Sequence, residues 1–71
     1  MKLIHEPYTK FKGWLRCNGL TYRDVAEMLG LSTTTVSAKI NGTSDFLLSE
    51  IRTIQKQYRL ENEIFFKNHV A

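Results

Sequence analysis

Glycines divide this chain into short segments and thereby limit what it can fold into. Gly19, Gly30 and Gly42 recur at intervals of 11 and 12 residues. Each follows a run in which apolar residues repeat every three or four positions, a pattern typical of one face of a helix. A glycine just past such a run commonly ends the helix, because glycine adopts the left-handed conformation without a steric penalty. The spacing therefore predicts several short helices.

We expect four to five helices and no strand, since no stretch shows the apolar alternation of a strand. Pro7 suits the first turn of the first helix, and Thr21 and Ser32 are favourable caps for the second and third. Gly13, inside the first helix, is interpreted as permitting a close approach. Because the connections around Gly30 are short, the predicted fold is a compact all-α domain with crossed helices. The segments expected to be helical are 6–18, 22–29, 33–41, 48–58 and a short piece within 60–66, before a frayed tail over 67–71.

The length of 71 residues supports one domain, residues 1–71, with a modest core. Cys17 is the single cysteine, so no intrachain disulfide can form, and it has no metal-ligand spacing with His5 and His69. We expect no cofactor and no metal. No stretch has the apolar length of a signal peptide or a membrane span, so a cytoplasmic location without membrane contact is expected.

The net charge of +3 is unevenly distributed. Residues 1–43 carry the whole excess, whereas the basic and acidic residues of 44–71 cancel. This distribution fits contact with an anionic ligand, and it equally fits an ordinary solvated surface. We do not expect an enzyme, because the acidic residues are scattered singly and no serine or cysteine has an evident base partner.

Two predicted helices lie only three residues apart, over 22–29 and 33–41. Ala26 is small enough for the two helices to cross closely, and Gly30 allows the sharp turn between them. Leu31 and Val36 fill the angle between the helices. This order of residues predicts a helix-turn-helix over about residues 22–41.

The segment "TYRDVAEMLGLSTTTVSAKING" resembles the helix-turn-helix of the Cro and phage-repressor family. The resemblance extends over "YTKFKGWLRCNGL" and "DFLLSEIRTIQKQYRL", so it covers about residues 6–66. It implies a lambda-repressor-like DNA-binding domain and a small phage or prophage transcription regulator of the bacterial cytoplasm. The chain departs from the family pattern at Tyr22, where many relatives carry Gln, and at Lys39, where an aliphatic residue is common.

The predicted recognition helix over 33–41 has a face of short side chains. At about 100° per residue, Val36 and Ile40 define its buried direction, and Ala38 points directly away from it. Thr34 and Thr35 also point outward, whereas Thr33 lies near the buried side and has an alternative structural role at the helix end. Short side chains let a helix approach base edges closely in the major groove.

Candidate DNA contacts divide into two groups. Base contacts are predicted for Thr33, Thr34, Thr35 and Ala38. Backbone contacts are predicted for Tyr22, Arg23, Ser32, Ser37, Lys39, Asn41 and Thr43. An alternative role for Lys39 is to cover apolar neighbours with its stem. The cations of the first helix are interpreted as ordinary surface.

The expected partner is a double-stranded DNA operator, bound by a homodimer at least on the DNA. A palindromic operator with half-sites one helical turn apart follows from the limited specificity of one small domain. Phe65 and Phe66 are adjacent and cannot both face one core, so one of them is expected to be an exposed dimer or partner contact. The alternative function is a phage modulator or antirepressor, which binds another regulator protein instead of DNA.

Overall fold

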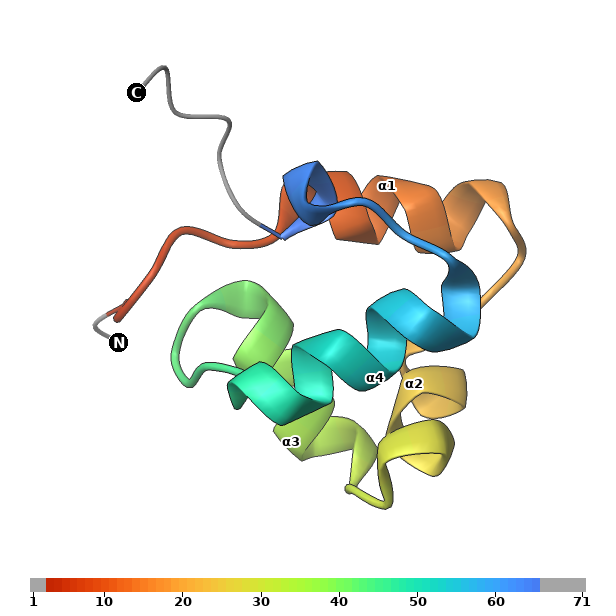
Figure 1. Cartoon of the computed structure of the whole chain (residues 1–71). Coiled ribbons are helices and arrows are strands. Elements are labelled where there is room, and N and C mark those ends of the chain that lie inside the picture. Colours follow the sequence, from red (N-terminus) through yellow and green to blue (C-terminus); the bar gives the residue numbers. More distant parts are fainter. Residues whose placement is uncertain (1–2, 66–71) are drawn as a thin grey trace.

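Four α-helices and one 3₁₀ turn make up the described part of the chain, residues 3–65 of a computed structural model (Figure 1). No strand occurs within these residues, so the expectation of an all-α fold is confirmed. The predicted bounds of the second, third and fourth helices are also confirmed. The elements are α1 (Thr9–Cys17), α2 (Tyr22–Leu29), α3 (Thr33–Asn41), α4 (Leu48–Tyr58) and η1 (Asn62–Ile64).

The first helix begins three residues later than predicted, at Thr9, so Pro7 lies outside it. The reason is tertiary, because the backbone before Thr9 is bonded to the end of α3. The N–H of Ile4 donates to the carbonyl of Gly42 at 2.7 Å, and the N–H of Tyr8 donates to that of Ile40 at 3.0 Å. We call this segment, residues 3–8, the N-terminal strap.

Glycine ends α1 as expected. Gly19 has a φ of 67°, its N–H donates to the carbonyl of Arg16, and the N–H of Leu20 donates to that of Leu15. These two bonds satisfy carbonyls that the helix itself leaves free. The interpretation of Gly13 is wrong, since apart from its chain neighbours and its own helix backbone no atom lies within 4 Å of the place where its side chain would be.

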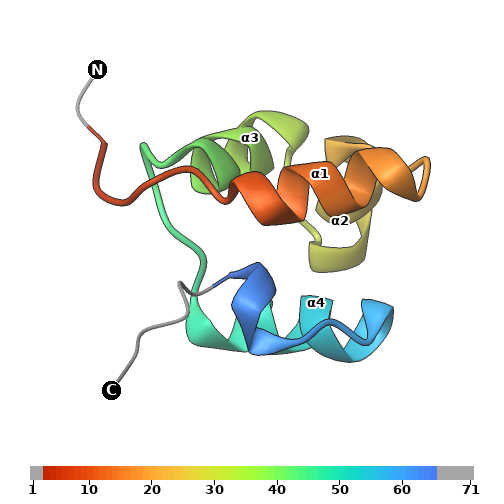
Figure 2. The same ribbon diagram turned by 90° about the horizontal axis from the view of Figure 1, so that it is seen from above.

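The core combines apolar side chains from all four helices, the α3–α4 loop and the segment after η1. Seen from above, α3 lies toward one side of α1 and α4 toward the other (Figure 2). None of the helices within residues 3–65 is long and apolar enough to cross a membrane. The buried residues are Phe11, Leu15, Val25, Ala26, Val36, Ile40, Phe46, Ile51, Ile54 and Phe65.

Phe65 belongs to this core and is not the exposed contact. It is 5% exposed, and its ring lies 4.8 Å from that of Phe11 and 5.4 Å from that of Tyr8, measured between centroids. The turn of η1 carries the chain back toward α1 and so buries the side chain (Figure 1). Phe66 lies outside the described residues.

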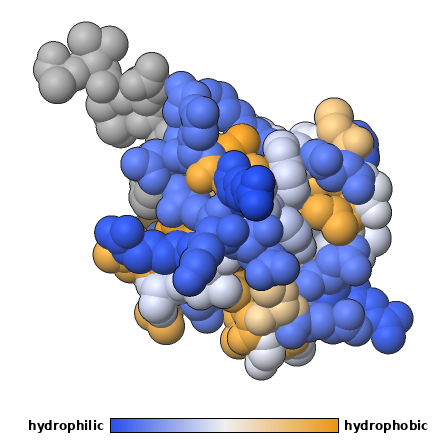
Figure 3. Space-filling model, turned by 45° about the vertical axis from the view of Figure 1, so that its right-hand side comes forward, coloured by the Kyte–Doolittle hydropathy of each residue, from blue (hydrophilic) through white to orange (hydrophobic). Residues whose placement is uncertain are grey.

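Hydrophilic groups cover most of the face in Figure 3, with apolar groups in separate small areas. Among residues 3–65, the large apolar side chains that are most exposed are Leu3, Ile4, Leu47 and Leu48.

Candidate nucleic-acid interface

Local sequence signals build the α2–turn–α3 unit, residues 22–41. Thr21 caps α2 reciprocally with Asp24: the N–H of Asp24 donates to the Thr21 hydroxyl, and the N–H of Thr21 donates to the Asp24 carboxylate at 2.7 Å. The bond from the Thr21 N–H to the carboxylate, and then a bond from the Thr21 hydroxyl to the same carboxylate, lower the pKa of the Asp24 carboxyl. Gly30, with a φ of 71°, then turns the chain toward α3. The N–H of Leu31 donates to the carbonyl of Ala26 and closes the turn.

Apolar packing holds α3 against the domain. Val36 and Ile40 are fully buried, and Ala26 on α2 is 3% exposed. Thr is a weak helix former, so this packing, together with the Ser32 cap, stabilises a helix that begins with three threonines. On the rest of the helix only Thr33 and Thr34 are exposed, whereas Thr35, Ser37, Ala38, Lys39 and Asn41 are half-buried.

The three threonines have different environments. Thr33 and Thr34 are exposed, whereas Thr35 is half-buried. The Ser32 hydroxyl donates to Thr35 Oγ1 at 2.8 Å and accepts from the Thr35 N–H at 3.1 Å. The placement of Thr33 near the buried side is wrong, because side chains of a helix lean toward its N-terminus and that of the first residue extends past the helix end. Thr33 and Thr34 are thus the exposed members of the predicted base-contact set.

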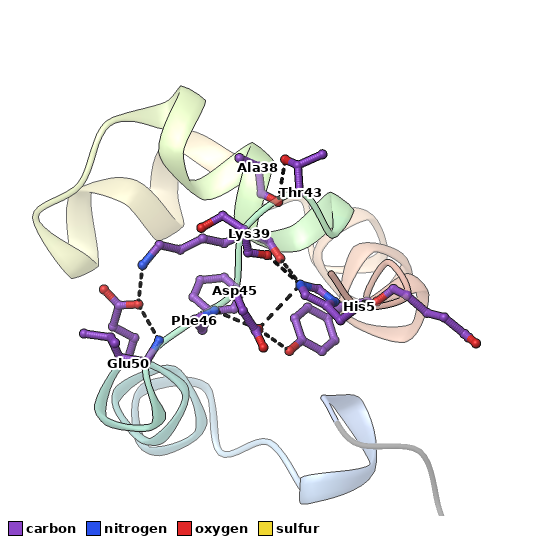
Figure 4. Close-up of polar contacts among 11 residues, drawn as sticks. His5, Ala38, Lys39, Thr43, Asp45, Phe46 and Glu50 are labelled. Atoms are coloured by element: carbon purple, nitrogen blue, oxygen red, sulfur yellow. Dashed lines mark hydrogen bonds and ion pairs between the residues drawn. The ribbon is translucent and has the colours of Figure 1, made fainter. Parts of the chain in front are cut away.

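Near the end of α3, polar groups of the helix and of the loop after it are hydrogen-bonded to one another. The carbonyl of Ala38, a half-buried residue, accepts from the N–H groups of Gly42, Thr43 and Ser44 at 3.0 to 3.2 Å. The Thr43 hydroxyl also donates to it, at 3.4 Å (Figure 4).

Two further predicted backbone contacts, Ser37 and Asn41, lie in the last turns of the same helix. Asn41 Nδ2 donates to the carbonyl of Ser37 at 2.9 Å and to its hydroxyl at 3.2 Å. Both residues are half-buried. The side-chain NH₂ group of Asn41 is therefore already hydrogen-bonded within α3.

Lys39, a predicted backbone contact, points into the protein, where its ammonium has an ion-pair partner. Its ammonium lies 2.7 Å from Glu50 Oε1, and the two side chains are 12% and 15% exposed (Figure 4). The ammonium also lies 5.8 Å from the ring centroid of Phe46, within the range of a cation–π contact. A second hydrogen bond holds the Glu50 side chain in place: its carboxylate accepts from the N–H of Leu47 at 2.9 Å, at the start of α4.

Opposing effects act on the pKa of the Glu50 carboxyl. Burial raises its pKa, but the hydrogen bond from Lys39, the bond from the Leu47 N–H and the charge of Lys39 outweigh burial. The pKa therefore lies below its ordinary value, and the ion pair is complete at neutral pH.

Sequence reasoning missed the cluster that fastens the N-terminal strap. His5 Nε2 lies 2.9 Å from the carbonyl oxygen of Lys39 and 2.7 Å from that of Ser44. The hydroxyl of Tyr8 donates to Asp45 Oδ1 at 2.7 Å (Figure 4). Burial, then the bond to Asp45 and its charge, raises the pKa of Tyr8 far above the usual value. These partners lie 34 to 39 residues apart in sequence, and no local pattern signals them.

The two predicted contacts on α2 differ in exposure. Tyr22 is half-buried and packs against the core. Arg23 is 79% exposed and lies 3.6 Å from Glu27 at the next turn. Across the α2–turn–α3 unit, the two cations Arg23 and Lys39 balance the two anions Asp24 and Glu27, so the unit has no net charge. The candidate interface is therefore polar and hydroxyl-rich but not basic.

Comparison with protein-family models, with curated proteins and with solved structures finds no match. No group of three metal-ligating side chains occurs within residues 3–65.

Proposed function

We propose that this protein is a sequence-specific DNA-binding transcription regulator with a lambda-repressor-like helix-turn-helix. The observation that carries the proposal is the α2–turn–α3 unit with its exposed Thr33 and Thr34. Both helices are capped, the turn has three residues, and the outer side of α3 bears short side chains. Such a helix fits the major groove, where a threonine offers a hydroxyl to a base edge and a methyl group to thymine.

In this proposal the regulator acts by occupying an operator, without catalysis, as a small phage or prophage repressor of the Cro type does. A single recognition helix with two exposed threonines reads few base pairs. Specificity then requires two copies on a palindrome with half-sites one helical turn apart.

The test is selection of DNA sites from a random pool, followed by gel shifts on the selected operator. We expect Thr34→Ala to change base preference at one or two positions, at about 1–3 kcal/mol per lost base contact. Thr53→Ala is the matched control, because Thr53 is exposed on α4 and, among residues 3–65, its hydroxyl bonds only the carbonyl of Ser49 within its own helix. Equal base preferences of the two variants and the wild-type protein would refute Thr34 as a base contact.

A protein-binding modulator or antirepressor is the second candidate. The balanced charge of the α2–turn–α3 unit and the inward position of Lys39 favour it, since they leave few cations for phosphates. In this case the hydroxyl-rich side of α3 would contact another regulator protein. Retention on heparin and a shift of random-sequence DNA at low salt are expected for the regulator, and neither is expected for the modulator.

A further inference from the structure

The basic charge that a DNA-binding protein needs lies on α1. This helix carries Lys10, Lys12 and Arg16 and no acidic residue. None of the three makes an ion pair within residues 3–65. The α2–turn–α3 unit has no net charge, and the charges of residues 48–65 also cancel. The excess of positive charge in residues 3–65 therefore comes from the segment that contains α1.

The two flanks of α1 differ in surroundings. Phe11 and Leu15 define its inward direction, being 0% and 2% exposed. On one flank, Trp14 packs against Tyr58 at the end of α4, with ring centroids 5.0 Å apart. Lys10 lies on this flank, in a shallow groove that is also lined by Arg59 and by two glutamates, Glu61 and Glu63. The cation of Lys10 is therefore partly balanced by its neighbourhood.

Lys12 and Arg16 lie on the other flank. Lys12 comes directly after the inward residue Phe11, and Arg16 comes directly after Leu15. Because Lys12 and Arg16 are four residues apart, they lie on the same side of the helix. Because the opposite flank contacts α4 through Trp14, this flank points away from α4. The helix α3 lies on the other side of α1 from α4 (Figure 2). No acidic partner balances either cation within the described residues.

We propose that Lys12 and Arg16 form a phosphate-contacting surface that anchors the protein on the backbone of double-stranded DNA while α3 enters the groove. The inference rests on the proposed function and assigns the electrostatic part of binding to α1 in place of Lys39. Backbone anchors of this kind supply affinity and fix the orientation of the recognition helix, but carry no sequence preference.

The test compares two double variants of equal charge change. Lys12→Gln/Arg16→Gln removes the proposed surface, and Arg52→Gln/Lys56→Gln removes two exposed cations four residues apart on α4. Dissociation constants on the selected operator are measured over a range of salt concentrations. We expect the slope of log affinity against log salt to fall by about 2 for the α1 variant, at roughly 0.9 per phosphate contact. The α4 variant should keep the wild-type slope.

Two further measurements separate phosphate contact from base contact and from a folding defect. The α1 variant should keep the wild-type ratio of operator to random-DNA binding, because phosphate contacts are not base-specific. The charge-preserving variant Lys12→Arg/Arg16→Lys should restore the slope. Equal slopes of the α1 and α4 variants would overturn the inference and leave the proposed function standing, whereas no wild-type binding to DNA at low salt would overturn both.

Discussion

The Lys39–Glu50 pair allows a quantitative test of the fold around α3. Glu50→Gln removes the negative charge but retains an oxygen that accepts from the N–H of Leu47, so the cap of α4 is kept. Lys39 is then left as a cation that is only 12% exposed. Breaking a fully buried pair costs about 3–5 kcal/mol, and exposed pairs contribute about 0–1 kcal/mol. With side chains 12% and 15% exposed, we expect a loss of about 2 kcal/mol.

Thermal and urea unfolding, followed by far-UV circular dichroism, measure this loss. For a domain of this size, about 2 kcal/mol corresponds to a fall in Tm of roughly 8–16 °C. Glu27→Gln is the matched control, because Glu27 pairs with Arg23 at 3.6 Å while both side chains are mostly exposed. The control should unfold close to the wild-type temperature. Lys39→Met in the Glu50→Gln background should recover part of the loss, since no unpaired cation then remains.

The pH dependence gives an independent check. The folded state lowers the pKa of Glu50 below its ordinary value of 4.5, so its contribution is complete above that value and is lost as the pH falls through the folded pKa. The stability difference between the wild-type protein and Glu50→Gln should therefore shrink in acid. A Glu50→Gln variant as stable as Glu27→Gln, or a stability difference independent of pH, would refute this account of the pair.

Three backbone predictions use the same unfolding assays. Gly13→Ala should stabilise α1 by about 1 kcal/mol, because the added methyl group meets no atom within 4 Å beyond its chain neighbours and its own helix backbone; an unchanged Tm would contradict this. Gly42→Ala should destabilise by about 2 kcal/mol or more, since Gly42 has a φ of 101° and the new side chain would collide with the carbonyl oxygen of His5. Arg59→Gly should raise stability by up to about 1 kcal/mol, because Arg59 ends α4 with a φ of 56°. A lower Tm of this variant would mean that the Arg59 side chain contributes more than its backbone costs.

The helices of this protein were predictable wherever their signals are local. The bounds of α2 and α3 follow from Thr21, Gly30, Ser32 and Gly42, because a cap or a left-handed glycine acts on the turn in which it stands. The start of α1 was wrong for the opposite reason. Pro7 has the local chemistry of a first helical turn, but the backbone bonds of the N-terminal strap go to the end of α3.

The candidate site likewise has features that local sequence predicts and features that depend on tertiary contacts. Helical periodicity sufficed to place Val36 and Ile40 in the core and Thr34 on the outside of α3. Periodicity gives the direction of a side chain but not its partner, so it could not reveal that Lys39 meets Glu50 from α4.

The sequence by itself determined where three glycines, Gly19, Gly30 and Gly42, and the capping residues divide the chain into short helices, and which side of each helix is apolar. Only the tertiary structure decided which polar side chains remain available at the surface. Lys39 and the N-terminal strap are held by partners 11 to 39 residues away. Contacts over such separations depend on how the whole chain packs, because a long side chain adopts the rotamer that its neighbours in space allow.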